Sequence, residues 1–259
     1  MSAEGFGLHP GLAALIGAYR ERNPPRTWSL IVTVFGDVAL PRGEAIRLTD
    51  LTSWMEALGI EPGLVRTALS RLVSNGTLTR ERDGRSAFYR VHPAAEPGFL
   101  AAADLIYGRH LPEPSGMMHL AVLEESSARS ALRGQLGTQG FVGFAPNLML
   151  RPGHIGHAVT GSEGALILDV SPNADLAKRA PTLWPLPMLA EGYRANIALA
   201  NGLNPMPADG AFLARILLVH EFRRVVLKDP FLPLPLLPPD WPGQAARRAF
   251  DAALRQLSD

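Results

Sequence analysis

The sequence predicts an α+β protein with helices and one hairpin at the start, a small sheet in the middle and helices at the end. Three observations predict it. Residues 64–76 repeat apolar side chains with a period of 3.6, and residues 77–92 then read as two strands around a turn at Asp83-Gly84. Residues 117–170 show strand and helix patterns in alternation, and residues 209–230 show the pattern of a long apolar helix.

Composition sets the outer limits. A chain of 259 residues with 47% hydrophobic and 19% charged residues is long enough for two or three domains with ordinary cores. The absence of cysteine excludes disulfides, thiolate metal sites and cysteine nucleophiles. The first ten residues lack the basic and apolar regions of a signal peptide, and no apolar run reaches the roughly 18 residues that a membrane span needs. We therefore expect a cytoplasmic protein.

The N-terminal part predicts a short arm and then three helices. The arm, residues 1–28, holds an amphipathic helix at 12–22, and an apolar run of helical length follows at 29–40. A second helix at 48–60 begins with Thr49 or Asp50 as its N-cap. Pro62 is placed to start the third helix, because proline lacks the N–H that a first helical turn leaves unpaired.

Three helices followed by a two-stranded ribbon are the element order of a winged helix-turn-helix, which we predict for residues 29–95. The apolar side of the third helix is expected to face the core. Its polar side carries hydrogen-bonding groups of the kind that read base edges in the major groove of DNA. Four residues make up this predicted reading face: Arg66, Thr67, Ser70 and Arg71.

Positive charge concentrates on the same stretch. Residues 62–92 contain six arginines and two acidic residues, a local net charge of +4, whereas the whole chain carries +1. A surface that meets DNA phosphates has this property. The contacts predicted from the ribbon are Arg80, Arg82, Arg85 and Tyr89. The alternative is a small α+β unit whose arginines are ordinary solvated charges, but helix order, polar face and basic hairpin together favour DNA binding.

A connecting helix within residues 96–114 is expected to lead to a middle domain at 115–173. Strand patterns at 117–125, 141–152 and 165–170 accompany a helix pattern at 128–140. This order predicts a small ferredoxin-like, or split β-α-β, domain.

The last part, residues 174–259, is predicted to be a helical domain. One helix begins near Pro187, a long helix covers 209–230 and a final helix covers 244–257. A proline-rich segment at 231–243 reads as an ordered connector between the last two.

Several segments carry a resemblance to a known family. They are SLIVTVFGD (29–37), LVRTALSRLVSNG (64–76) with GRSAFYRV (84–91), GFVGFAPNLMLRP (140–152) and LLVHEFRRVVLKDPFLPLPLLPPDWPG (217–243). The last is the most specific, because its order of His-Glu-aromatic-Arg-Arg, Asp-Pro and Asp-Trp-Pro-Gly is not set by helix periodicity. From residue 29 onward the chain resembles the phenylacetic-acid-degradation repressors, the PaaX-like transcriptional regulators.

The resemblance implies a cytoplasmic homodimer that binds an operator in double-stranded DNA. Typical members repress aromatic-acid catabolic genes and are released by an acyl-coenzyme A effector, phenylacetyl-coenzyme A. The family usually has tryptophans at the start of the middle domain, where this chain reads GMMHLAVLEES (116–126). The resemblance therefore does not specify which acyl group the effector carries. No cofactor is implied.

A coenzyme A thioester needs cations for its phosphates and an apolar pocket for its acyl end. The candidate effector-binding residues are Trp184, Tyr193, His220, Arg223 and Arg224. For the three residues of the long helix, the alternative is a structural polar cluster that holds the proline-rich segment against that helix. For the two aromatic residues, the alternative is core packing.

Catalytic motifs are missing from the sequence. His154 and His157 have no third ligand nearby, so a loop role is favoured over a metal site, and Arg224 stands where the second histidine of a HExxH motif would be. Gly161 and Gly164 are too close together for a GxSxG nucleophile elbow. We expect a regulator with no metal and no catalytic residues. The alternative is an acyl-coenzyme A-binding metabolic enzyme with an incidental winged domain.

Overall fold

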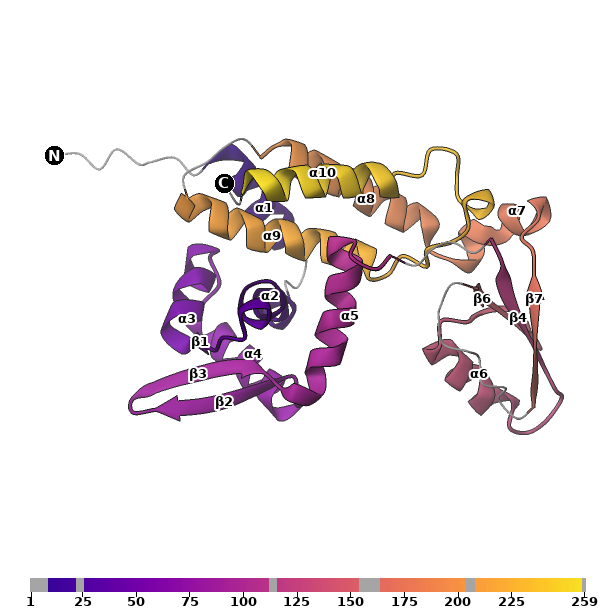
Figure 1. Ribbon diagram of the computed structural model, residues 1–259, viewed down its shortest axis with the longest axis horizontal. Coiled ribbons are helices and arrows are strands. Elements are labelled where there is room, and N and C mark those ends of the chain that lie inside the picture. Colours follow the sequence, from indigo (N-terminus) through magenta and orange to yellow (C-terminus); the bar gives the residue numbers. More distant parts are fainter. Residues whose placement is uncertain (1–8, 22–25, 112–115, 154–163, 204–207, 258–259) are drawn as a thin grey trace. The chain divides into compact units, whose positions relative to one another are not determined.

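A computed structural model describes residues 9–21, 26–111, 116–153, 164–203 and 208–257 (Figure 1). The chain divides into two compact units. Unit 1 combines residues 1–110, 193–227 and 244–259, and unit 2 combines residues 111–192 and 228–243. The expected mixture of helices with small antiparallel sheets is confirmed, with one sheet in each unit.

The described part of unit 1 begins with four α-helices. They are α1 (Pro10–Arg20), α2 (Thr27–Val34), α3 (Leu48–Ala57) and α4 (Pro62–Ser74). The apolar run at 29–40, predicted as one helix, changes helix type along its length. After α2 it continues as a π-helical segment, Phe35–Ala39, and a 3₁₀ turn, Leu40–Arg42, ending at Gly43 with a φ of 65°.

The sheet of unit 1 consists of β1 (Ile46–Arg47), β2 (Leu78–Asp83) and β3 (Ser86–Val91) in the antiparallel order β1-β3-β2. Asp83 pairs with Ser86, so the hairpin turn is Gly84-Arg85, one residue later than the predicted Asp83-Gly84. A two-residue hairpin turn requires a positive φ at its first residue, and Gly84 supplies it at 56°. Arg85 therefore lies at the tip of the hairpin.

Helices from the second half of the chain complete the core of unit 1. The long helix α9 (Ala208–Val226) packs against α1, against α2 and against α5 (Glu96–Tyr107). Phe222 of α9 stacks on Phe250 of α10 (Gly243–Gln256) with ring centroids 4.1 Å apart. Arg247 of α10 donates to carbonyls at the end of α5, those of Leu105 at 2.6 Å and of Ile106. These contacts tie α5 and the C-terminal helices into one body.

The sheet of unit 2 has four strands in the antiparallel order β5-β6-β4-β7. They are β4 (Met118–Leu123), β5 (Val142–Ala145), β6 (Leu148–Pro152) and β7 (Ala165–Val170). Helix α6 (Arg129–Thr138) joins β4 to β5 and covers one face of the sheet through Leu132 and Leu136, which pack with Ala121 and Met149.

One helix was not predicted. Residues 174–183 form α7 (Ala174–Leu183), which ends before α8 (Leu186–Asn201) begins. The side chain of Asn173 accepts a hydrogen bond from the N–H of Leu176 and caps the start of α7. Pro181 lies in the last turn of α7, where losing one hydrogen bond interrupts little of the helix. Residues 174–259, predicted as one helical domain, are divided between the two units. The predicted domain boundaries remain a prediction.

Candidate nucleic-acid interface and ligand cavity

The exposed side of α4 is the first half of the candidate interface. Its apolar residues Val65, Ala68, Leu69 and Leu72 are buried. All four residues of the predicted reading face are exposed: Arg66, Thr67, Ser70 and Arg71. The Thr67 hydroxyl donates to the carbonyl of Gly63 at 2.9 Å, which closes the first turn of the helix.

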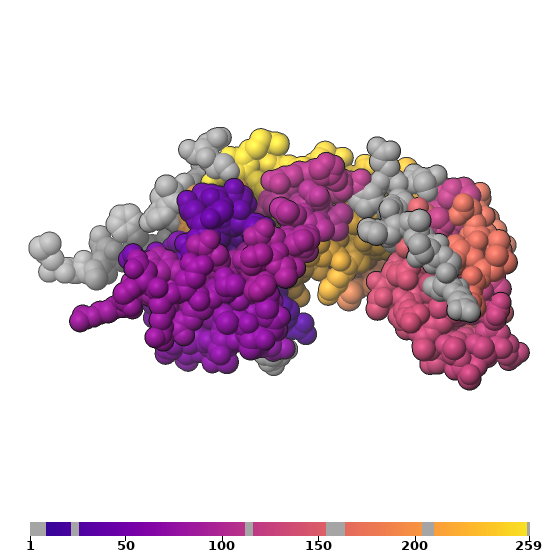
Figure 2. All heavy atoms as spheres, turned by 60° about the horizontal axis from the view of Figure 1, so that its bottom comes forward, coloured from indigo at the N-terminus to yellow at the C-terminus, as the bar shows by residue number. Residues whose placement is uncertain are grey.

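The hairpin supplies the second half, and its tip stands out from the surface of unit 1 (Figure 2). Arg80, Arg82 and Arg85 are exposed. Arg90, on the neighbouring strand, instead forms an ion pair with Glu81 at 3.0 Å. That pair neutralises one acidic and one basic residue of the hairpin. Asp83 is then the one acidic residue of the hairpin that offsets the charge of the three remaining arginines.

Tyr89 does not fit the predicted wing contact. It is only 7% exposed, and it pairs with both Ile46 and Arg80 across the sheet. Arg80 lies on the same face of the hairpin as Tyr89, because residues directly opposite in an antiparallel pair share a face. That face is covered by the core at Tyr89, so we correct its assignment to a core residue.

A groove beside α4 adds residues that the sequence did not suggest. Arg26 and Trp28 line it together with Leu64, Thr67 and Arg71. Arg26 is exposed and precedes the first turn of α2. It was missed because residues 1–28 were read as an arm outside the winged unit, and sequence distance concealed that α2 packs on α4.

The five effector candidates do not form one site within either unit. Trp184 belongs to unit 2, where it is 4% exposed, whereas the other four candidates belong to unit 1. Tyr193 is 2% exposed and packs against Phe222 with ring centroids 6.3 Å apart. Core packing, the alternative considered for both aromatic residues, describes their surroundings.

His220 is a buried structural residue. Its Nδ1 lies 2.9 Å from the hydroxyl of Thr33 on α2, and its ring meets Tyr19 edge-on. Burial, together with the nearby charge of Arg223, lowers the pKa of His220 to about 3, so the ring is neutral at physiological pH. A neutral buried ring offers no charge to an effector. The polar cluster considered as the alternative does exist, but these contacts join α9 to α2.

The two arginines of α9 have different surroundings. Arg224 pairs with the buried Glu221 at 3.6 Å, one turn away on the same helix. Arg223 donates from Nη1 to the carbonyl and hydroxyl oxygens of Ser29, each at 3.3 Å, and to Thr33 at 3.4 Å. Arg223 also lines a cavity.

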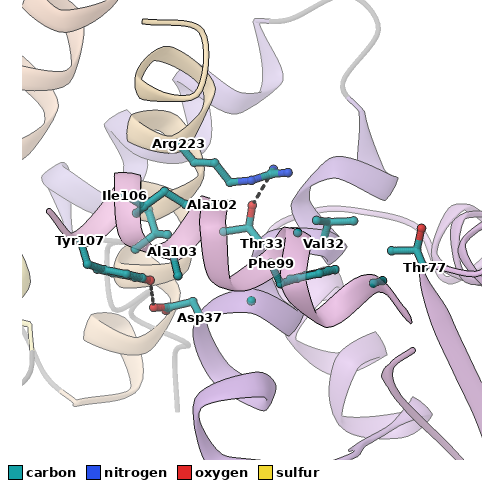
Figure 3. A pocket seen from close by; sticks show the side chains of 14 residues that line it. Val32, Thr33, Asp37, Thr77, Phe99, Ala102, Ala103, Ile106, Tyr107 and Arg223 are labelled. Atoms are coloured by element: carbon teal, nitrogen blue, oxygen red, sulfur yellow. Dashed lines mark hydrogen bonds between the residues drawn. The ribbon is translucent and has the colours of Figure 1, made fainter. Parts of the chain in front are cut away.

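That cavity lies inside unit 1 and has a volume of about 290 Å³. Helices α2, α5 and α9 form its walls, with Phe99, Ala102 and Ala103 presented by α5 (Figure 3). Its 14 lining residues are Val32, Thr33, Gly36, Asp37, Thr77, Ala95, Gly98, Phe99, Ala102, Ala103, Ile106, Tyr107, Val219 and Arg223.

Asp37 anchors a polar network at this cavity. Its carboxylate accepts two hydrogen bonds from Arg215, at 2.9 Å from Nε and 2.7 Å from Nη2, and one from the hydroxyl of Tyr107. The Asp37 side chain is 2% exposed. Burial and the adjacent carboxylate raise the pKa of Tyr107, so its hydroxyl stays protonated and donates. Burial alone would lower the pKa of Arg215, but the contact with Asp37 raises it overall.

Among the described residues, no cluster of three or more acidic or histidine side chains could hold a metal ion. His154 and His157 lie outside the described residues. No helix in the described ranges combines the length and apolarity needed to cross a bilayer.

Comparison with known proteins shows which family the chain belongs to. Residues 26–94 match the PaaX-like protein family and residues 184–259 match the PaaX-like protein C-terminal domain. Over 243 residues the chain is 33% identical to the transcriptional repressor PaaX of Escherichia coli strain K12, covering 85% of this chain and 77% of that protein. The chain belongs to the PaaX-like family. This membership confirms the resemblance read from the sequence.

A solved structure of an uncharacterized protein, Rv0674 from Mycobacterium tuberculosis, shares the fold of the PaaX-like chain. It matches with a TM-score of 0.50 and 23% identity over 81% of this chain and 87% of that chain. Family membership and the repressor relative support a transcriptional regulator, and they exclude the metabolic enzyme considered as the alternative.

Proposed function

We propose that the protein is a sequence-specific DNA-binding repressor in which α4 reads base edges and the β2–β3 hairpin lies along phosphates. The order α2, β1, α3, α4, β2, β3 with the sheet β1-β3-β2 supports a winged helix-turn-helix over residues 29–95. The observation that carries the proposal is the exposed polar face of α4 beside a hairpin with three exposed arginines. Since DNA is the partner, we place the protein in the cytoplasm.

We further infer that the regulated genes serve aromatic-acid catabolism and that an acyl- or aryl-coenzyme A thioester releases the repressor. The E. coli relative, named as a transcriptional repressor, supports regulation by repression. By linkage, an effector that favours a form with misplaced α4 helices weakens DNA binding, and DNA weakens effector binding by the same factor.

Unit 2 supports a split β-α-β arrangement within the predicted range 115–173. The order β5-β6-β4-β7 places β6 between β4 and β5, the two strands that α6 connects.

An apolar strip lies on one face of β4 and β7, where Leu120 is opposite Leu168 and Val122 is opposite Leu166. The two β7 leucines are 58% and 40% exposed, at positions 166 and 168 respectively.

We propose that a second copy of the chain covers this apolar strip, giving the homodimer that two operator half-sites require. We expect the double variant Leu166→Glu, Leu168→Glu to be monomeric at concentrations where the natural protein is a dimer, because glutamates would be buried without partners. Sedimentation velocity measures the mass. Leu234→Glu is the control, since Leu234 is 69% exposed but lies on another element. A dimeric double variant would contradict the proposed interface.

The DNA-binding proposal is tested by the salt dependence of operator affinity. The operator is first recovered by sequencing the DNA fragments that the purified protein retains. Each phosphate neutralised by an arginine is expected to contribute about −0.9 to the slope of log affinity against log salt. Replacing Arg80, Arg82 and Arg85 by alanine should make the slope shallower. Arg255→Ala, at an exposed position of α10, is the control. A flat salt dependence of the natural protein would exclude the hairpin as a phosphate contact.

A further inference from the structure

The cavity of unit 1 has the size and lining of a small-molecule site. Its volume of about 290 Å³ is just below the usual range for ligand pockets, roughly 300–1,000 Å³. Most of its wall is apolar: α2 contributes Val32, and α5 contributes Phe99 and Ile106. A space of this size holds an aromatic ring with a short chain, and it cannot enclose a whole coenzyme A molecule.

The two charged residues of the wall differ in how their charges are balanced. The carboxylate of Asp37 is fully engaged by Arg215 and Tyr107. Arg223 has no such balance, because no carboxylate among the described residues pairs with it. Its hydrogen bonds are long, at 3.3–3.4 Å, and Nη1 donates all three of them to neutral oxygens. A guanidinium carries five N–H donors, so Nε and Nη2 retain donors for a ligand.

Burial makes this imbalance costly. The pKa of Arg223 is lowered by desolvation, which is the sign of a cation removed from water without an anion beside it. A ligand oxygen that carries negative charge would offset that cost, and a guanidinium matches the geometry of a carboxylate. The cavity therefore favours a ligand with an apolar body and one oxygen acceptor at its end.

We propose that this cavity binds a short aryl or branched acyl group, with its carbonyl or carboxylate oxygen against Arg223 and its apolar body against α5. Two sources have this chemistry. One is a free carboxylic acid, and the other is the acyl end of a coenzyme A thioester, whose nucleotide would lie outside the cavity. The second source rests on the effector proposed above, whereas the first does not.

The site adjoins the helix proposed to read DNA. Thr77 lines the cavity, and its N–H donates to the carbonyl of Leu72 at 2.9 Å and to the side chain of Asn75 at 3.1 Å. These bonds close the C-terminal end of α4. A ligand in the cavity thus touches the turn that ends this helix, which provides a direct route from ligand binding to operator affinity.

The test is titration calorimetry of the full chain with phenylacetate, phenylacetyl-coenzyme A and coenzyme A as separate probes. We expect at least one of the two acyl compounds to bind at least tenfold more tightly than coenzyme A. Arg223→Gln should weaken that binding at least tenfold, because the charged donors are lost. Ala102→Phe should abolish it by filling the cavity. Ala101→Phe is the matched control, since Ala101 is exposed on the same helix and does not line the cavity.

Binding by phenylacetate identifies the free acid as a source, and binding by the thioester alone identifies the acyl end. Either result supports the proposal if both cavity variants lose it. Failure of both acyl compounds to bind, or unchanged binding by Arg223→Gln, would overturn it. If Ala102→Phe does not fold, Arg223→Gln carries the test. Operator binding is measured on the same preparations, so a regulator that binds DNA but no acyl compound refutes the cavity ligand and leaves the proposed repressor function intact.

Discussion

Asp37→Ala is expected to lower the free energy of unfolding of unit 1 by about 3–5 kcal/mol, the usual cost of removing one partner from a buried ion pair. Asp37 is 2% exposed at its side chain and Arg215 is 29% exposed. Without the carboxylate, the Arg215 guanidinium keeps its charge in a partly buried position, and the buried Tyr107 hydroxyl loses its acceptor. Urea unfolding followed by circular dichroism measures the change.

Two further variants separate charge from packing at this network. Asp37→Asn keeps the shape and one acceptor oxygen, so its loss of stability should be intermediate. Asp175→Ala is the control, because the Asp175–Lys178 pair is 84% and 77% exposed and an exposed pair contributes little to stability. If the Asp37→Ala variant has the same free energy of unfolding as the natural protein, this network does not hold α9 against the π-helical segment.

Arg71→Ala is expected to reduce operator affinity by roughly 1–3 kcal/mol and to relax the preference at one operator position, because a side chain that reads a base edge carries sequence information. Arg85→Ala should instead weaken binding to all sequences about equally, because we propose that Arg85, which lies in the hairpin turn, contacts phosphate alone. Affinities for the operator and for a panel of single-base variants, measured at one fixed salt concentration, distinguish the two outcomes.

Arg90→Ala is the matched control for these arginines. Arg90 is on the same hairpin, but it is already paired with Glu81 at 3.0 Å. Its removal should therefore change operator affinity less than removal of Arg85. If Arg71→Ala and Arg85→Ala both fold and bind with natural affinity, the exposed face of α4 and the hairpin tip are not the DNA-binding surface.

Local patterns were sufficient for the elements of the proposed interface. The apolar period of residues 64–76 predicted both the helix α4 and the side that is buried, because a helix repeats its faces within a few residues. The alternation on either side of a glycine predicted the hairpin, although the turn is one residue later. The resemblance carried by four segments of the sequence led to the same family that the comparisons show.

Tyr89 shows what local sequence patterns cannot predict. Alternation along a strand shows that Arg80 and Tyr89 share a face of the hairpin, but it does not show how far the core extends over that face. Tyr89 is buried and Arg80 is exposed although they are paired, because Tyr89 lies on the central strand β3, between β1 and β2, whereas Arg80 lies on the edge strand β2. The same limit applies to His220, whose partners on α1 and α2 were not visible in the sequence of α9.

The sequence by itself determined the described α-helices other than α7, the hairpin, the concentration of positive charge and the family. Only the tertiary structure decided that α9 packs on α2 and α5, and so created the cavity and its polar groups. Asp37 and Arg215 are 178 positions apart, and Thr33 and Arg223 are 190 apart. The physical reason is that periodicity reports which side of an element is buried, whereas the partner of that side depends on the path of the whole chain.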